Sequence, residues 1–408
     1  MKHIIVVGGS LAGHQTAKCL RDLGYAGDLT VYGAEAHGPY DRYPLSKSYL
    51  TGELHRSGLD IEPRDLDVDW ELGRRATGLD LAGRRVTIDN REQARFDGLV
   101  VATGSRPRVN IAGHGATRGV HALRSIEDSA TLKAALVADG GRRLVVVGGG
   151  LIGAEVASVA SAAGHHTTLV DSSPIPTARA LGPTAARHVS DLHEARGVRL
   201  LTGARVRGLD VHADHVNGVV LRNGDRLAAD LVVLATGTRP NVEWLDGSGL
   251  DASCDGLRCR ATLHAYGSDL VVGAGDVVDA PHPALDGASV RVEHWASTRH
   301  QARVAAANLL AGPDHASSQS ELPSFGTTLH GAAIRAVGFP AKADDDEVVW
   351  GSIQDGEAVV AMRRHGRLIA AVAVNAADKL KLLVDPWSEQ ISAQRAGRSS
   401  RWSSTVRG

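Results

Sequence analysis

Short apolar runs alternate with alanine-rich segments along most of the chain. Ile4–Val7, Leu144–Val147 and Leu231–Leu234 are aliphatic and have the length of buried strands. Two of these runs lead through a glycine-rich turn into segments of helical length, Ala12–Leu23 and Ala154–Ala163. This alternation predicts an α/β fold, in which helices are layered on a sheet.

The most specific motif lies between residues 142 and 171. Gly148, Gly150 and Gly153 form a G-x-G-x-x-G pattern between a predicted strand and a predicted helix, which is the context of a dinucleotide site. Such glycines make the tight turn, let the backbone approach a pyrophosphate and let the helix pack on the strand, while the helix amino terminus faces the phosphates. Asp171 follows Gly153 at close to the spacing of about 20 residues expected for a ribose ligand, so we expect NAD rather than NADP.

The amino terminus carries a weaker copy of this motif. Gly8 and Gly13 take the first and third positions, and Ser10 stands in place of the second glycine. Because serine is small, a phosphate can still approach the backbone there. Glu35 lies near the spacing of about 20 residues for a second ribose ligand. Two dinucleotide sites in one chain imply a relay between two cofactors.

A second repeat indicates one domain inserted into another. The pattern A-T-G-x-R-P occurs at residues 102–107 and 235–240, each time at the end of an apolar run. Each copy lies where the chain would leave a nucleotide-binding unit, so residues 109–241 are predicted to form a complete unit inserted into a first unit of residues 1–108 and 242–316. Continuous domains placed end to end are the alternative.

Two further segments present single charged groups. Pro44 and Ser46 favour a loop that leads into a helix, and Lys47 there offers a cation, although local sequence alone favours a solvated surface lysine. The run at 269–276 is predicted to be a strand that enters a glycine turn and presents Asp276. A helix is expected from Ala296 to Leu310.

Residues 317–408 are predicted to form a small α+β domain. The runs 348–353, 358–362 and 368–374 indicate an antiparallel meander, with a hairpin turn at 364–367. The last twenty or so residues are rich in serine and arginine and poor in apolar side chains, so we expect a tail there.

Composition excludes several other classes of protein. The chain has 45 basic and 46 acidic residues, a net charge of −1, which gives no reason to expect nucleic acid or membrane as a partner. No apolar run approaches the roughly 18 residues of a membrane span. The first predicted strand begins near His3 and leaves no room for a signal peptide, and three cysteines do not make a disulfide framework, so a cytoplasmic protein is expected.

These motifs, taken in order, resemble the FAD-dependent, NADH-linked ferredoxin reductases. The resemblance rests on the two glycine motifs, the P-L-S-K segment, the two A-T-G-x-R-P strands, the G-A-G-D turn and V-E-H-W, and it covers residues 1 to about 310. Such enzymes serve Rieske oxygenases and bacterial cytochromes P450 and are related to rubredoxin reductases and apoptosis-inducing factor. The resemblance implies two Rossmann-like domains, with the NAD unit inserted in the FAD unit, and a carboxy-terminal domain that covers one side of the flavin.

The resemblance also implies roles for particular residues. Lys47 and Glu155 match a pair beside the flavin N5, where they would act in catalysis. The residues expected to contact FAD are Gly8, Ser10, Gly13, Glu35, Arg42, Lys47, Thr103, Gly104, Asp276 and Trp295. Those expected to contact NADH are Gly148, Gly150, Ile152, Gly153, Glu155, Asp171 and Gly237.

The chain departs from the family pattern in two places. Tyr43 replaces the first proline of R-P-P-L-S-K. An F-W-S-D-Q segment, which in relatives faces flavin and ferredoxin, appears as residues 325–330, where Gly326 has lost the tryptophan and Thr328 the acid. We expect this glycine to open space over the flavin, which puts the identity of the electron acceptor in doubt.

Other redox and metal chemistries are weaker interpretations. Cys254 and Cys259 have the C-x₄-C spacing of disulfide reductases, but they lie more than two hundred residues too late and are better explained by packing. His212 and His215 are explained by a hairpin, so no metal is expected.

The sequence therefore predicts an NADH:ferredoxin oxidoreductase, monomeric or homodimeric. One alternative is a flavoprotein that reduces a small acceptor such as a quinone, oxygen or an organic substrate. Another is a redox-sensing interaction protein.

Overall fold

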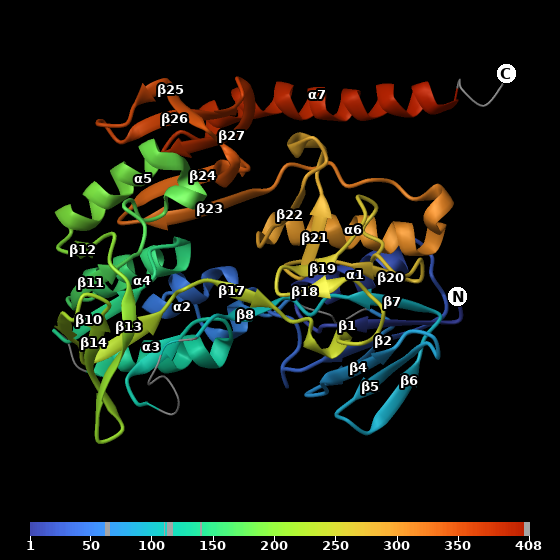
Figure 1. The fold of residues 1–408 in the computed structure, drawn as a ribbon, viewed down its shortest axis with the longest axis horizontal. Coiled ribbons are helices and arrows are strands. Elements are labelled where there is room, and N and C mark those ends of the chain that lie inside the picture. Colours follow the sequence, from blue (N-terminus) through green and yellow to red (C-terminus); the bar gives the residue numbers. More distant parts are fainter. Residues whose placement is uncertain (62–65, 110, 112–116, 139–140, 404–408) are drawn as a thin grey trace.

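The computed structural model describes residues 1–61, 66–109, 111, 117–138 and 141–403. Two five-stranded parallel sheets lie beside each other, and an antiparallel sheet lies above them in the view of Figure 1. Helices cover the parallel sheets, so the α/β class and the carboxy-terminal α+β unit are confirmed. No helix in the described part of the chain is long and apolar enough to cross a membrane.

The first sheet has the strand order β20-β7-β1-β2-β3. Strand β1 lies at its centre, between β2 and β7, and its core residues are almost completely buried. The strands are β1 (His3–Val7), β2 (Asp28–Gly33), β3 (Asp69–Leu72), β7 (Gly98–Val101) and β20 (Val271–Gly273).

The second sheet has the strand order β12-β11-β10-β16-β9 and repeats this arrangement. Strand β10 pairs with β11 on one side and β16 on the other, as β1 pairs with β2 and β7. The strands are β9 (Val120–Ala122), β10 (Arg143–Val147), β11 (His166–Val170), β12 (Arg199–Leu201) and β16 (Leu231–Leu234).

The chain passes between the two sheets through one pair of short strands. β8 (Ser105–Pro107) and β17 (Thr238–Pro240) pair antiparallel, which sets the two arginines of the repeated pattern, Arg106 and Arg239, opposite each other. The chain thus enters and leaves the second sheet at the same place.

Helices follow the glycine turns and connect the units. α1 (Leu11–Asp22) follows β1 and packs against α6 (Trp295–Ala311), and α4 (Leu151–Ala162) follows β10. The 3₁₀ turn η1 (Tyr43–Ser46) and helix α2 (Ser48–Thr51) of the first unit lie against helices of the second (Figure 1). The remaining helices of the two units are α3 (Ile126–Ala138) and α5 (Ala178–Ala195), and the other 3₁₀ turns are η2 (Arg56–Gly58), η3 (Glu243–Leu245), η4 (Pro283–Leu285) and η5 (Pro313–His315).

Both units contain smaller sheets in addition to their five-stranded parallel sheet. The hairpin of β13 and β14 turns at Ala213 and Asp214, both at positive φ, and Gly224 turns the chain from β14 into β15, so the hairpin interpretation of His212 and His215 is confirmed. The strands are β4 (Ala76–Asp80), β5 (Arg85–Ile88), β6 (Glu92–Arg95), β13 (Val206–His212), β14 (His215–Leu221), β15 (Arg226–Ala228), β18 (Ala252–Ser253), β19 (Gly256–Arg258), β21 (Val278–Pro281) and β22 (Ser289–Arg291).

The carboxy-terminal unit is a five-stranded antiparallel sheet with the order β23-β24-β27-β26-β25. The predicted meander is confirmed, and its turn lies at His365 and Gly366. The altered segment at 325–330 forms an edge strand and the turn after it. The elements are β23 (Ser324–Leu329), β24 (Ala332–Gly338), η6 (Pro340–Lys342), β25 (Asp345–Ser352), β26 (Glu357–Arg364), β27 (Arg367–Val374) and α7 (Ala377–Ser403).

The expected carboxy-terminal tail is wrong for residues up to 403. Helix α7 packs on the sheet through Leu380, Trp387 and Ile391 and then continues beyond it as a single helix (Figure 1). Alanine, glutamine and arginine are good helix formers, and extending an existing helix requires no new nucleation. Residues 404–408 lie outside the described part of the chain.

Candidate functional site

A cavity of about 1660 Å³ lies where the first sheet, helix α4 and the carboxy-terminal sheet meet. This volume exceeds the roughly 300–1,000 Å³ of pockets for drug-sized ligands and suits a dinucleotide. Its walls include the first glycine loop, the segment around Lys47, the start of α4, the turn at Asp276 and strands β23 and β24.

The first glycine loop is shaped by close backbone contacts. Gly8 has φ +126°, and a Cβ there would lie 2.1 Å from the carbonyl oxygen of Ala102. A Cβ on Gly13 would lie 1.8 Å from the carbonyl oxygen of Gly8. Only glycine fits either position, so strand β7 and the repeated A-T-G pattern that follows it determine the shape of the loop.

The second loop repeats these contacts. Cβ atoms on Gly148 and Gly153 would lie 2.3 Å from the carbonyl oxygen of Ala235 and 1.9 Å from that of Gly148. A Cβ on Gly150 would meet nothing within 4 Å. The backbone at Gly150 therefore faces open space, as an approaching pyrophosphate requires.

Both helices that follow these loops can attract an anion. Neither α1 nor α4 has an acidic residue in its first turn, and neither amino terminus is capped by a side chain. Their first N–H groups and the positive end of each helix dipole remain available for phosphate.

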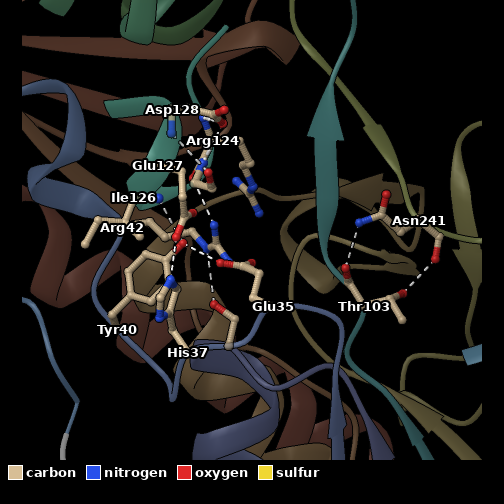
Figure 2. A network of polar contacts seen from close by, with 12 residues as sticks. Glu35, His37, Tyr40, Arg42, Thr103, Arg124, Ile126, Glu127, Asp128 and Asn241 are labelled. Atoms are coloured by element: carbon tan, nitrogen blue, oxygen red, sulfur yellow. Dashed lines mark hydrogen bonds and ion pairs between the residues drawn. The ribbon is translucent and has the colours of Figure 1, made fainter. Parts of the chain in front are cut away.

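A polar network ties the first glycine loop to the acid after β2 (Figure 2). The guanidinium of Arg42 contacts the Glu35 carboxylate, lies 3.2 Å from Ser10 Oγ and donates to the Arg124 carbonyl at 2.9 Å. The Tyr40 hydroxyl donates to Glu35 at 2.6 Å, and burial raises the pKa of that phenol. Glu35 and Ser10 are thus held in place together at the cavity wall.

Asp276 lies at the turn after β20 with its carboxylate inside the cavity. It accepts hydrogen bonds from Ser105 Oγ at 3.0 Å and from Arg124 Nη2 at 2.8 Å. Nearby, Thr103 exchanges two hydrogen bonds with Asn241, at 2.7 and 2.8 Å (Figure 2). These bonds tie Thr103 and Ser105, which follow β7, to Asn241 after β17 and to Asp276 after β20.

Lys47 reaches from the first unit to Glu155 of the second. Lys47 Nζ lies 2.8 Å from the Glu155 carboxylate, which is 5% exposed. Glu155 also accepts from Thr327 Oγ1 of β23 at 2.6 Å and from the Ser46 hydroxyl. The pair joins all three parts of the molecule at one wall of the cavity.

Packing explains why Lys47 is not the surface lysine that its local sequence favours. Leu45 lies in one buried cluster with Ile126 of α3, and Leu50 in another with Leu132 of the same helix. Ser129 donates to the Leu45 carbonyl at 2.6 Å. The whole segment is therefore docked on the second unit.

The amino end of α6 borders the cavity with two aromatic side chains. Trp295 is 42% exposed, and the ring of His294 lies 4.8 Å from that of Phe325. Burial lowers the pKa of His294 to about 4, and its Nδ1 is buried without a partner among the described residues. A neutral histidine there keeps one unused polar atom beside the cavity.

Asp171 lies at the end of β11, outside the cavity lining. Its carboxylate accepts from the Gly149 N–H and from the Ser173 N–H, the latter at 2.6 Å. The acid thus lies against the second glycine loop, where a ribose next to the pyrophosphate would lie.

The expectation that Gly326 opens space is wrong in part, because Arg335 lies against it. Gly326 and Arg335 are direct cross-strand partners on β23 and β24. A Cβ on Gly326 would lie 2.9 Å from Arg335 Nη1 and 3.1 Å from its Cδ. The arginine takes space that an aromatic side chain at 326 would need.

The expected site residues fall into two groups. Those that line the cavity are Gly8, Ser10, Glu35, Arg42, Lys47, Thr103, Gly104, Asp276, Trp295, Ile152 and Glu155. Gly13 packs behind the first loop, and Gly148, Gly150, Gly153, Asp171 and Gly237 lie around the second loop and the end of β16.

Sequence reasoning missed several partners of these groups. Ser46 lies inside the P-L-S-K motif, where the sequence indicated only a loop leading into a helix, and its hydroxyl bonds to Glu155. Thr327, Arg124 and Arg335 carry no local signal, because each reaches the site from a distant element. Packing explains Cys259, which is buried in the core of the first unit, but not Cys254, which is exposed in the turn between β18 and β19; both thiols are free.

Comparison with known proteins agrees with this geometry. Residues 2–302 match the protein family described as pyridine nucleotide-disulphide oxidoreductase. The biphenyl dioxygenase system ferredoxin–NAD(+) reductase component of Paraburkholderia xenovorans is 33% identical over 377 residues, which cover 91% of this chain and 90% of that protein.

Solved structures extend the likeness to the fold. The covalent putidaredoxin reductase–putidaredoxin complex contains a chain with a TM-score of 0.87 and 28% identity, covering 97% of this chain and 93% of that one. The ferredoxin reductase for the CYP199A2 system from Rhodopseudomonas palustris has a TM-score of 0.86 and 28% identity, covering 93% of this chain and 92% of the other.

Proposed function

Because the chain belongs to the pyridine nucleotide-disulphide oxidoreductase family, together with ferredoxin reductases, we propose that it is an FAD-dependent NADH:ferredoxin oxidoreductase that serves an oxygenase or a cytochrome P450. This membership confirms the resemblance found in the sequence. The observation that carries the proposal is the ion pair between Lys47 and Glu155, which connects two nucleotide-binding units inside one cavity.

The residues around the cavity fit FAD. Ser10 and the open amino terminus of α1 would hold the pyrophosphate, Glu35 a ribose, and Asp276 the polar chain that leads to the ring. Trp295 would lie near the flavin ring, and Gly8, Arg42, Thr103 and Gly104 would complete the wall. When bound, FAD supplies the chemistry of hydride acceptance from NADH and single-electron release to an iron–sulfur protein.

The second loop fits NADH. Gly148, Gly150 and Gly153 would surround its pyrophosphate, Asp171 its adenosine ribose, and Ile152 and Glu155 would bring the nicotinamide to the cavity. We assign residues 109–241 to this NAD-binding domain, residues 1–108 and 242–316 to the FAD-binding domain, and residues 317–408 to an interface domain. The paired strands β8 and β17 support that division.

Lys47 and Glu155 would act on the reaction through charge. A cation held inside the cavity stabilises negative charge that develops beside it, and Glu155 offsets the cost of burying that cation. Hydride transfer needs no general base, so the chain supplies orientation and exclusion of water. A cytoplasmic location is part of the proposal, because the cysteines are free and such thiols persist in reducing compartments.

The test is NADH-dependent cytochrome c reduction with and without an added [2Fe–2S] ferredoxin. A strong requirement for the ferredoxin is expected. Fast NADH oxidation with quinone or oxygen, unaffected by ferredoxins, would instead show a reductase of small acceptors. NADH-dependent dimerisation with negligible turnover would show a redox-sensing protein, and the same sizing experiment determines whether the resting protein is a monomer or a homodimer.

A further inference from the structure

Gly326 and Arg335 are direct cross-strand partners on β23 and β24, and both line the cavity. Glycine inside a strand weakens it and often marks a place where another group approaches closely. Here the approaching group is the Arg335 side chain, whose Nη1, Cδ and Cζ would all lie within 3.2 Å of a Cβ at position 326. The glycine therefore allows the arginine to lie flat against the backbone of β23.

Arg335 keeps its charge free in this position. Its guanidinium makes no hydrogen bond or ion pair with any residue that the structure describes, and the residue is exposed at the edge of the cavity. Glu155 in the same wall is already occupied by Lys47, Ser46 and Thr327. Lys381 of α7 lines the same cavity and is also exposed, so it adds a further positive charge.

The arginine lies close to the groups that surround the reaction site. Burial and the Glu155 carboxylate raise the pKa of the Tyr43 phenol, while the Arg335 guanidinium acts in the opposite direction. The Tyr43 ring itself lies under Lys47 Nζ at 4.0 Å. A group that binds Arg335 would therefore lie beside the same wall as the Lys47–Glu155 pair.

We propose that Arg335 recognises a carboxylate of the iron–sulfur partner and thereby selects an acidic ferredoxin as electron acceptor. This inference rests on the proposed function. A guanidinium presents N–H donors in a planar fork that matches a carboxylate. Because Arg335 has no ion pair with a described residue, no such pair has to break when it binds a carboxylate of the partner. Charge pairs of this kind mainly determine the association rate and the choice of partner in transient redox complexes.

The experiment measures binding and turnover with an acidic [2Fe–2S] ferredoxin in Arg335→Glu and Arg335→Ala. At low ionic strength, Arg335→Glu is expected to lower kcat/KM for the ferredoxin about tenfold, weaken its Kd similarly and flatten the salt dependence. Flavin reduction by NADH, followed anaerobically by stopped flow, should stay unchanged. The matched control is Arg222→Glu, an exposed arginine in the turn between β14 and β15 that has no ion pair among the described residues.

Gly326→Trp provides an independent perturbation. The tryptophan ring would displace the Arg335 guanidinium, so the loss of ferredoxin affinity should resemble that of Arg335→Ala. The double variant Gly326→Trp with Arg335→Ala should lose little more affinity than either single variant. An Arg335→Glu enzyme with wild-type ferredoxin kinetics and affinity would overturn the inference about Arg335 but not the proposed function. An equal loss in flavin reduction would overturn it too, because the arginine would then act on NADH. A wild-type enzyme that reduces no ferredoxin overturns the proposed function itself.

Discussion

Lys47 Nζ lies 2.8 Å from the carboxylate of Glu155, and the two residues belong to different nucleotide-binding units. The carboxylate is almost completely buried and is shared with the hydroxyls of Ser46 and Thr327. Breaking a buried pair by removing one partner costs more than removing both, because the survivor keeps an uncompensated charge.

We therefore expect non-additive effects from Lys47→Met and Glu155→Gln. Each single variant should slow flavin reduction by NADH and lower the free energy of unfolding by about 3 kcal/mol, whereas the double variant should lose less than the sum. Stopped-flow reduction and denaturant unfolding measure both quantities. The exposed pair Lys18 and Asp22 of α1 is the control, since its removal should change neither. Strict additivity would contradict the coupling.

Asp171 should determine the preference for NADH over NADPH. A carboxylate next to the second glycine loop can bind ribose hydroxyls but repels a phosphate dianion. Asp171→Arg is expected to lower the ratio of kcat/KM with NADH to kcat/KM with NADPH. The stability of this variant should also fall, because the Gly149 and Ser173 N–H groups lose their acceptor. Steady-state kinetics with both cofactors measure the ratio. Equal values in the native enzyme would be incompatible with this role.

Asp276 should hold FAD. Its carboxylate is fixed by Ser105 and Arg124 and faces the cavity, so Asp276→Ala removes a polar contact and leaves the Arg124 guanidinium without its acid. The variant is expected to purify with little flavin, as measured by flavin absorbance per protein. Asp276→Asn, which keeps the shape and one acceptor oxygen, should retain more. Full occupancy in the alanine variant would limit Asp276 to a structural role.

Stability should fall below neutral pH because of a buried histidine pair. His330 Nε2 lies 2.8 Å from His193 Nδ1 between the carboxy-terminal sheet and α5, and burial, with His330 as the second cause, lowers the pKa of His193 to about 4. The unfolded chain then binds more protons than the folded one between about pH 6.5 and 4. The free energy of unfolding is therefore highest above pH 6.5 and decreases as pH falls through this window. His193 alone accounts for a decrease of up to about 3 kcal/mol.

The thermal unfolding midpoint, measured across this window, tests the histidine pair. His193→Gln is expected to flatten the pH dependence, and His212→Gln, at an exposed hairpin position, should leave it unchanged. His282 and His294, whose pKa values burial also lowers to about 4, should preserve part of the slope. If the thermal unfolding midpoint of His193→Gln depends on pH as strongly as that of the native protein, the histidine pair is not the titrating group.

Sequence alone determined the features that depend on neighbouring residues. The contact between Gly13 and the Gly8 carbonyl forms within one turn, so the spacing of the two glycines can be recognised in the sequence. The apolar runs and helical segments are equally local, because burial and periodicity are read within a few residues. The tight contact of Gly8 with Ala102, and of Gly148 with Ala235, gives the physical reason for the repeated A-T-G pattern.

Only the tertiary structure decided what surrounds the reaction site. Local sequence favoured a solvated Lys47, and packing of Leu45 and Leu50 on α3 brought it to Glu155. Loss of the tryptophan at Gly326 suggested an open space, which Arg335 partly fills from the next strand. These groups meet through packing between distant elements, and the side-chain pattern of one segment carries no information about which segment will lie against it.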